Sequence, residues 1–539
     1  MSSSLRLGCR AVPGLPPLAW LAEVPPHGGA VRVHHGAAVE CREDWLVAGA
    51  WDGEFQDGGF HTSDHFCGSG VRVSGDTLYA APASALVNRI VYCTERERVL
   101  VSNSLALLLA FTGAQLDPQH DYRRETHAFR AGEGRYDKAF RVLHSEITSF
   151  YQVSGELLMV RDGATSYASL RATPSVPSFE RYRELMATAL DRLRRNSASR
   201  ERRLPLSAFI AMSAGYDSAA SAVLVKDLDI EACFTARRSN SHVPRWLSPR
   251  AAIDDGTPIA ALLGLRTEYL DTRSAAVTED EAYFLAPGCA PAMPALHSLT
   301  RRVSATNRPA ILFTGFLGDE MWDMDPKEHD FGSRGIVRGD TTALMLSEIE
   351  LKCGVVPVAV PGLLGRSIRD ITALSASPEM APWRVGGKYD RPIARRLLAE
   401  AGIPARLFAQ RKKAVVSTRL YPANRALRRE FFAALRNEIG WRPVHVYAHE
   451  LANRIAFWCF RGYHVARRLV TAAPPPKTPA VLIGPRVDLA YAMFGWACRH
   501  VSAQLAAVLQ AARPAVDGPA PAPLRRAAPL AASSPATVS

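Results

Sequence analysis

The sequence predicts an α/β protein with a mostly β N-terminal half, a C-terminal half built on a doubly wound parallel sheet, and a low-complexity tail. In the first half, short apolar stretches are separated by turn residues, and long helical periodicity is rare. In the second half, short strands and helices alternate, which is typical of a parallel sheet. Pro and Ala dominate the end of the chain. We therefore expect domains over residues 1–175 and 176–472, followed by a partly disordered extension over 473–539.

The size and composition of the chain argue against several classes of protein. With 539 residues, 47% of them hydrophobic and 22% charged, the chain is long enough for two globular domains with large cores. The net charge of +13 suits nucleic acid or an anionic substrate such as ATP, but no groove-reading motif accompanies it, so nucleic acid is not favoured. The sequence has no signal-peptide pattern and no apolar run of about 18 residues. We expect a cytoplasmic protein that does not cross a membrane.

The cysteines and histidines do not follow the spacing of a metal site. The chain has nine cysteines, an odd number, and no C-x-x-C pair. This pattern argues against a disulfide framework and against a zinc or iron–sulfur centre, and it fits a reducing cytoplasm. Histidines such as His34 and His35 also lack metal-ligand spacing, so we interpret them as structural.

Short strands are predicted throughout the N-terminal half, because apolar stretches alternate there with turns. The predicted strands cover residues 31–35, 45–49, 70–73, 89–93 and 99–102. A helix is expected over 104–111, ended by Gly113. Asp162-Gly163 is a strong turn signal and predicts a late hairpin after the apolar residues 157–160.

The C-terminal half opens with an amphipathic helix over 179–195, where apolar side chains recur at helical spacing. The elements expected after it are strands over 206–212, 232–235, 267–270 and 310–315 and helices over 219–225, 258–263 and 489–512, with a basic helical stretch over 395–470. Ligands bind at the carboxyl ends of parallel strands. We therefore expect the two glycine turns, at 214–215 and 315–318, to face a ligand.

The first candidate site follows the strand that ends at Met212. The chain there reads Ser-Ala-Gly-Tyr-Asp-Ser, and its polar or small members are Ser213, Gly215, Tyr216, Asp217 and Ser218. Small residues allow close backbone approach, backbone N–H groups and hydroxyls at a helix start bind phosphate, and a carboxylate can hold Mg²⁺ beside it. The alternative is an ordinary strand–turn–helix connection with a serine cap. The pattern resembles the pyrophosphate-binding loop of ATP pyrophosphatases.

The second candidate site is the stretch Thr314-Gly-Phe-Leu-Gly-Asp-Glu320, which also follows a predicted strand. Taken together, the two motifs resemble the synthetase domain of the asparagine synthetase family. In that family the second loop reads Ser/Thr-Gly-x-Gly-x-Asp-Glu, whereas here the second glycine stands one residue closer to the aspartate. The first loop of the family has two glycines after the serine, and this chain has Ala214 in place of one of them.

This resemblance implies the identity of the bound groups. It implies binding of ATP and Mg²⁺, with Asp217 and Asp319 sharing the metal ion. Gly315 and the residues of the first loop would bind ATP or pyrophosphate. A carboxylate at position 254 or 255 would follow the second strand of the sheet.

Two further stretches resemble the family's reaction centre. Residues 347–364, with Glu350 and its neighbour Glu348, resemble the Glu-x-Arg-x-Pro stretch, and we carry the family's glutamate to Glu350 with Glu348 as the alternative. Residues 406–413 resemble the Arg-x-Lys stretch, which implies a catalytic role for Lys413 and pyrophosphate binding by Arg411. A lysine there can neutralise the charge that builds as an amine attacks. The alternatives are a surface helix for the glutamates and a solvated basic helix face for the lysine.

The N-terminal half resembles a degenerate copy of the family's glutaminase, an Ntn-hydrolase-like αββα sandwich. The family's nucleophile is a cysteine directly after the initiator Met, where this chain has Ser2. The resemblance is therefore closest to members without the glutaminase cysteine, such as β-lactam synthetases and lasso-peptide cyclases. It implies a doubly wound, adenine-nucleotide hydrolase-like synthetase domain in the C-terminal half.

The function that follows is an ATP-dependent, AMP- and pyrophosphate-forming amide-bond synthetase of specialised metabolism, such as antibiotic biosynthesis. It would join a small-molecule or peptide carboxylate to an amine without hydrolysing glutamine, and the sequence leaves a homodimer open. Two alternatives remain: a tRNA-modifying ATP pyrophosphatase, because of the basic charge, and a non-catalytic ATP-binding homologue, because of Ala214.

Overall fold

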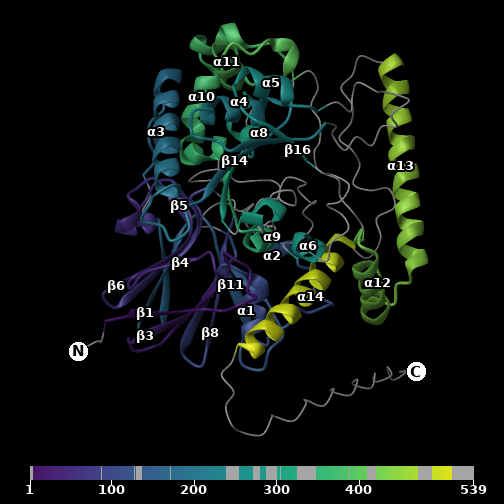
Figure 1. Ribbon diagram of the computed structural model, residues 1–539. Coiled ribbons are helices and arrows are strands. Elements are labelled where there is room, and N and C mark those ends of the chain that lie inside the picture. The colour runs from purple at the N-terminus through teal and green to yellow at the C-terminus, as the bar shows by residue number, and fades with distance from the viewer. Residues whose placement is uncertain are drawn as a thin grey trace, which may run out of the picture.

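The structure is a computed structural model. It describes residues 4–85, 88–126, 128, 136–169, 172–237, 254–270, 280–286, 300–303, 305–306, 308–324, 347–387, 389–409, 421–470 and 489–512. None of the helices within these ranges has the length and apolar character needed to cross a membrane. Mixed α/β architecture with several sheets is confirmed (Figure 1).

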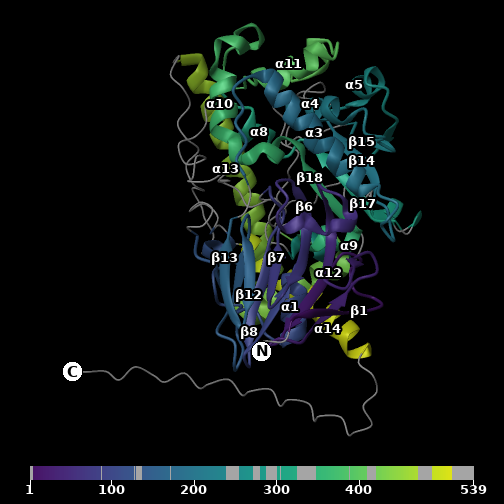
Figure 2. The same ribbon diagram turned by 90° about the vertical axis from the view of Figure 1, so that its left-hand side faces the viewer.

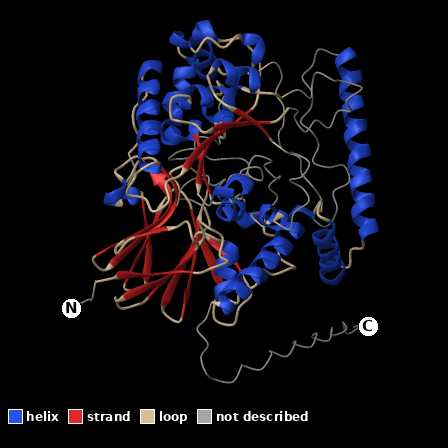
Figure 3. Ribbon diagram, in the orientation of Figure 1, coloured by secondary structure: helices blue, strands red, loops and turns tan. Residues whose placement is uncertain are grey.

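Two sheets make up the N-terminal half (Figure 3). The first has seven strands in the order β1-β3-β2-β9-β8-β11-β10. Its strands are β1 (Arg6–Ala11), β2 (Trp20–Val24), β3 (Ala30–His35), β8 (Ile90–Glu95), β9 (Arg98–Ser102), β10 (Ala139–Arg141) and β11 (Ser149–Val153). The second has six strands in the order β13-β12-β7-β6-β5-β4. Its strands are β4 (Glu40–Cys41), β5 (Trp45–Trp51), β6 (Phe66–Ser74), β7 (Thr77–Ala81), β12 (Leu157–Arg161) and β13 (Ala164–Ala168).

The two sheets face each other across a shared core. The indole nitrogen of Trp20 on β2 donates to Ser69 Oγ on β6 over 3.0 Å, and Asn103 Nδ2 donates to the same oxygen over 2.9 Å. Helix α1 (Leu105–Thr112) packs on β2, β8 and β9 of the first sheet, and α3 (Phe179–Ser197) packs on β5 of the second. Both helices were predicted from sequence, and both begin at a serine that caps the first turn, Ser104 and Ser178.

The C-terminal half contains the predicted parallel sheet. Its order is β16-β15-β14-β17-β18, and every neighbouring pair is parallel. The strands are β14 (Ser207–Met212), β15 (Ala232–Thr235), β16 (Thr267–Tyr269), β17 (Ala310–Thr314) and β18 (Val355–Ala359). From β14 the chain adds strands on one side and then, from β17, on the other. The order therefore reverses between β14 and β17, which is the point at which such sheets bind ligands.

Helices connect and surround these strands. They are α2 (Arg123–Thr126), α4 (Tyr216–Val225), α5 (Thr257–Leu262), α6 (Glu281–Leu285), α8 (Gly318–Met321), α9 (Ser347–Cys353), α10 (Ile368–Ala376), α11 (Pro392–Glu400), α12 (Arg425–Ile439), α13 (Pro443–Val470) and α14 (Leu489–Ala511). Figures 1 and 2 show the parallel sheet above the two N-terminal sheets, with α14 beside α1 at the base.

Strand β18 was not predicted as a strand, because Pro357 lies in its middle. A proline removes one ladder donor and is tolerated mainly at the edge of a sheet. β18 is the edge strand of the parallel sheet, and its inner side pairs with β17. It also packs against β5 and β6 and so joins the parallel sheet to the N-terminal half.

One pair of cysteines contradicts the expectation drawn from cysteine spacing. Cys9 and Cys41 form a disulfide although they are 32 residues apart in sequence. The reason is topological, because β1 and β4 are the edge strands of the two N-terminal sheets and meet at the same end of the sandwich. A spacing rule based on local motifs cannot detect a pair of this kind.

Candidate active site

The loop after β14 is held by its own hydroxyl groups. Ser213 N donates to Ser218 Oγ over 2.9 Å, and Gly215 N donates to Ser213 Oγ over 3.1 Å. The two hydroxyl oxygens lie 3.0 Å apart. These bonds tie the end of β14 to the first turn of α4. The loop is half-buried, so a ligand can reach it.

An acidic side chain contacts the middle of this loop. Ala214 N donates to Asp254 Oδ1 over 3.2 Å. Asp255 does not contact this loop in the same way, because its Oδ1 accepts a hydrogen bond from Thr257 N over 2.9 Å at the start of α5. Of the two carboxylates left open by the sequence, it is therefore Asp254 that meets the loop. Three successive N–H groups of the loop therefore already have acceptors within the protein, two hydroxyl oxygens and one carboxylate oxygen, which an incoming phosphate would have to replace.

The loop after β17 packs directly on the first loop, as the sequence predicts. A Cβ atom at Gly315 would lie 2.3 Å from Ser218 N, and one at Gly318 would lie 2.5 Å from Asp217 Cβ. Neither distance leaves room for a side chain, so glycine is required at both positions. Leu317, between them, has a φ of 69°. It takes the left-handed conformation that usually belongs to glycine.

The two predicted metal ligands, Asp217 and Asp319, both interact electrostatically with the guanidinium group of Arg391. Arg391, whose side chain is 3% exposed, forms an ion pair with Asp217, which is 26% exposed. Burial opposes the charge on Arg391, but the carboxylates of Asp217 and then Asp319 outweigh it and raise its pKa. Both aspartates therefore lie near the same guanidinium group. The ion pair with Arg391 also neutralises part of the negative charge of Asp217.

Sequence reasoning missed the contribution of α11. Arg391 precedes this helix, and Arg395 one turn later forms a hydrogen bond with the hydroxyl of Tyr216. The signal was present, because Pro392 marks a helix start and basic residues four positions apart share one face. That face packs against α4 and brings two cations to the first loop.

The two basic residues predicted downstream lie outside the described residues. Arg411 and Lys413 fall within 410–420, and the last described residue before them is Ala409. Ala409 N donates to the carbonyl oxygen of Ala214 over 2.8 Å, and the ring of Phe408 lies 5.6 Å from that of Tyr216. The chain therefore reaches position 409 in contact with the first loop.

Glu350 does not lie at this site. It belongs to α9, which precedes β18, whereas the loops follow β14 and β17. Thr314 and Ala359, the last residues of β17 and β18, pair with each other. Helix α9 precedes β18, so it lies at the amino ends of the strands, opposite to the two loops. The resemblance placed a carboxylate near the reaction centre, and the carboxyl end of β18 carries apolar residues instead. The assignment of Glu350 to the site is therefore wrong.

Glu350 and Glu348 both face the N-terminal half. Glu350 is 5% exposed and lines a cavity of about 20 Å³, room for one water molecule, together with Ser69, Asn88 and Asn103. Burial raises its pKa well above the ordinary value. Glu348 Oε2 accepts from Ser104 Oγ over 2.7 Å, and its Oε1 accepts from a backbone N–H of α1. Glu348 is thus a structural link between the two halves.

A scan against protein-family profiles finds no match for this chain, and a search of curated proteins finds no significant similarity. The two loops bring two serine hydroxyls, three carboxylates and two arginines together at the reversal point of a parallel sheet. That combination can hold a polyanion with its counter-ion.

Proposed function

We propose that the chain is an ATP-dependent amide-bond synthetase of the asparagine synthetase type, which forms AMP and pyrophosphate. The observation that carries the proposal is the contact between two loops about 100 residues apart, each matching one half of the family's nucleotide site. Gly315 and Gly318 both pack on the first turn of α4. The two loops follow neighbouring parallel strands, so their small residues and carboxylates meet at one edge of the sheet.

The first loop is the proposed phosphate cradle. The hydroxyls of Ser213 and Ser218 and the loop N–H groups, released from their present partners, would bind the triphosphate, and Arg391 and Arg395 would balance its charge. The N–H of Ala214 now donates to the Asp254 carboxylate, so a phosphate oxygen would have to replace that carboxylate. Arg411 and Lys413, just beyond the contact at Ala409, remain proposed ligands of pyrophosphate and of the reacting oxygens.

Asp217 and Asp319 would be the ligands of the Mg²⁺ ion, and their carboxylate oxygens suit it chemically. Carboxylate oxygens are its preferred protein ligands, and Mg²⁺ is usually held by one or two carboxylates together with substrate phosphates. When bound, the ion would supply charge neutralisation for the phosphate groups. The chain itself supports this fit by placing glycine at 318, against the side chain of Asp217.

The proposed reaction joins a carboxylate and an amine from the substrate. Attack of the carboxylate on the α-phosphate would release pyrophosphate, and attack of the amine would then release AMP. Holding both reactants together removes much of the entropic cost of their meeting, up to about 7–11 kcal/mol of the barrier. We assign no nitrogen source to the N-terminal half, because its first cysteine, Cys9, lies within β1 and is paired with Cys41.

The test is calorimetric titration with ATP and Mg²⁺, followed by pyrophosphate release with panels of carboxylate and amine compounds. Asp319→Asn should weaken the metal-dependent binding of ATP at least tenfold. Asp217→Asn is a less clean variant, because it leaves the buried Arg391 without its charged partner. Asp227→Asn, at the exposed end of α4, is the matched control and should bind like the wild type. Equal affinity for all three variants would refute the nucleotide site.

A second candidate is a non-catalytic ATP-binding homologue. Two observations favour it: Asp217 is already paired with Arg391, and no carboxylate stands at the carboxyl end of β18. In that case ATP would bind, Asp319→Asn would weaken it, and no pair of carboxylate and amine compounds would produce AMP.

A further inference from the structure

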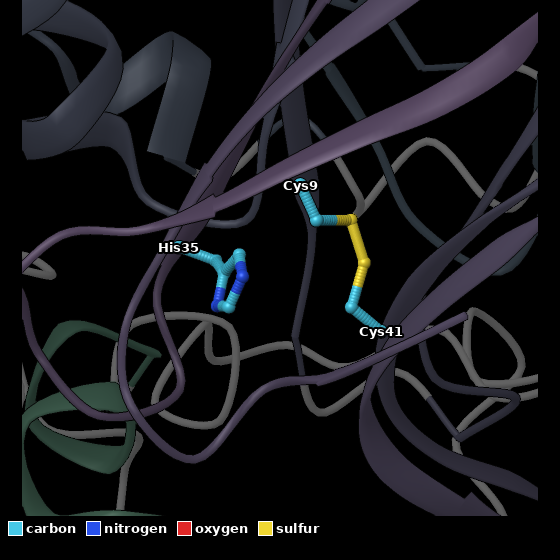
Figure 4. A group of neighbouring side chains, drawn as sticks. All are labelled: Cys9, His35 and Cys41. Carbon is cyan, nitrogen blue, oxygen red and sulfur yellow. A yellow bond between two sulfur atoms is a disulfide. The ribbon is translucent and has the colours of Figure 1, made fainter. Parts of the chain in front are cut away.

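Three side chains suited to a soft metal ion come together away from the nucleotide site. Cys9 lies on β1, His35 ends β3, and Cys41 lies on β4. One ligand atom of each lies within 4.8 Å of the other two. Figure 4 shows the ring of His35 with one nitrogen toward the two sulfur atoms and the other nitrogen away from them. The cluster joins the edge strands of the two N-terminal sheets.

The imidazole of His35 is oriented as a metal ligand would be. Its Nδ1 lies 2.9 Å from the carbonyl oxygen of Gly36. A carbonyl only accepts hydrogen bonds, so Nδ1 must donate, and the lone pair of the neutral ring is on Nε2. His35 is 7% exposed, and among the residues that the structure describes no group donates to Nε2. Metal-bound histidines are typically fixed by such a bond from their other nitrogen.

A disulfide between Cys9 and Cys41 does not explain this arrangement. A disulfide cannot donate a hydrogen bond, so within the described part of the chain it leaves the lone pair of Nε2 without a partner. The Cα atoms of the two cysteines are 6.8 Å apart, at the upper end of the range for disulfides. Cys9 is exposed on its edge strand, so a reductant can reach the bond.

We propose that Cys9, His35 and Cys41 bind one Zn²⁺ ion when the two cysteines are reduced. Two thiolates and one imidazole form a donor set typical of zinc, with a fourth position left for water. Reduction by a dithiol transfers two electrons and two protons to the sulfur atoms, and the dithiol becomes a disulfide. Zinc binding then forms two Zn–S bonds and one Zn–N bond and releases the two thiol protons.

The edges of the two sheets would be tied in both states, by the disulfide when oxidised and by zinc when reduced. The backbone already holds them in place, because Leu7 N donates to the carbonyl oxygen of Glu43 over 3.2 Å. The ligands are therefore presented by strands whose positions do not depend on the disulfide alone.

The experiment measures zinc bound to the full chain after reduction with a dithiol, incubation with Zn²⁺ and removal of the excess. We expect one zinc ion per chain in the wild type and in Cys459→Ser, which removes an exposed cysteine on α13. Cys9→Ser, Cys41→Ser and His35→Ala should each lose at least nine-tenths of it. Circular dichroism checks that these variants are folded.

Replacement of zinc by Co²⁺ in the wild type gives a second readout that needs no variant. Thiolate-to-cobalt absorption should appear in the reduced protein and disappear on oxidation to the disulfide. The proposal is overturned if the reduced wild type retains no zinc, if Cys9→Ser retains it fully, or if the cobalt protein lacks thiolate absorption.

Discussion

The buried carboxyl group of Glu350 makes the stability of the protein depend on pH. Burial raises its pKa in the folded state, whereas the unfolded chain has an ordinary carboxyl pKa. The folded protein therefore binds more protons than the unfolded chain above the ordinary carboxyl range. Its free energy of unfolding falls as the pH rises toward the folded-state pKa. Glu350→Gln should remove this loss and stabilise the protein at neutral pH.

Chemical denaturation at a series of pH values measures this effect. Glu184→Gln, on an exposed part of α3, is the matched control and should keep the wild-type pH dependence. The proposed binding of ATP should be unchanged in Glu350→Gln, because Glu350 lies at the amino ends of the strands, opposite to the loops after β14 and β17. An unchanged pH dependence in Glu350→Gln would show that this group does not ionise as argued.

A side chain at Gly315 should separate the two loops of the proposed nucleotide site. In Gly315→Ala the new Cβ would overlap the backbone of Ser218 at 2.3 Å, and only a backbone shift can relieve that contact. We expect a loss of about 1–3 kcal/mol in stability and at least a tenfold loss of ATP affinity. Gly462→Ala is the control, because nothing lies within 4 Å of its Cβ position on α13. It should stabilise the helix by about 0.5–1 kcal/mol. Normal ATP affinity in Gly315→Ala would contradict the shared site.

The meeting of the two loops could be predicted from sequence because each loop lies within a local pattern. Gly315 and Asp319 follow a strand, and Asp217 follows another, so the end of each strand is a sufficient signal. Arg391 could not be found in this way, because it is brought to Asp217 by the packing of α11 on α4. Glu350 was misplaced for the related reason that a motif carries no information about which edge of the sheet its residue occupies.

At the scale of elements, the hydrogen bond between Ser104 and Glu348 couples α1 to α9. Ser104 caps α1, and its hydroxyl donates to Glu348, which also accepts from the backbone of that helix. Ser104→Ala and Glu348→Gln should each destabilise the protein by about 1–3 kcal/mol. Because the residues share one network, the double variant should lose less than the sum, with a coupling of about 0.5–3 kcal/mol.

Denaturation of the four proteins of this cycle measures the coupling. Ser178→Ala removes the cap of α3, whose carboxylate partner is Glu379 and not Glu348, and serves as the matched control. Combined with Glu348→Gln, it should show additive losses. If the losses of Ser104→Ala and Glu348→Gln also added, the hydrogen bond between these two side chains would contribute nothing to the stability of the contact between α1 and α9.

Elements with strong local signals were predicted well, and those defined by tertiary pairing were not. The helices α1, α3 and α14 agree with their predictions within a few residues, because apolar runs and end signals mark them. β1 was missed, because its six residues are mostly exposed and it is ordered by parallel pairing with β3. β18 was missed because Pro357 weakens its strand signal. In both cases the determining contact is remote in sequence.

At the scale of the whole molecule, the two halves and the tail are less separate than composition indicates. Strand β18 packs on β5 and β6, and α14 packs on both α1 and α6. Composition placed α14 in a peripheral extension, because it follows a Pro/Ala-rich stretch. Its inner face is nevertheless buried, and Phe494 lies 5.7 Å from Tyr122 and 6.4 Å from Phe140 between ring centroids. A helix from the end of the chain thus completes the core of the N-terminal half.

Removal of α14 should therefore unfold the protein, whereas removal of the residues after it should not. The large side chains that it buries are Leu489, Met493, Phe494, Trp496, Val501 and Leu505. At about 1.5–3 kcal/mol each, their burial is comparable with the whole stability of a typical domain, about 5–15 kcal/mol. A chain ending at residue 488 should yield no cooperative thermal transition, and a chain ending at residue 512 should melt like the full chain.

A point variant separates the packing of α14 from the effect of shortening the chain. Phe494→Ala leaves a cavity against Tyr122 and Phe140 and should cost about 3–5 kcal/mol. Gln510→Ala, on the exposed side of the same helix, should change stability by less than about 0.5 kcal/mol. Because α14 contacts α1 and α6 from opposite halves, the loss in Phe494→Ala should appear as one transition shifted to lower temperature. Two separate transitions would instead show that the halves fold independently and that α14 belongs to only one of them.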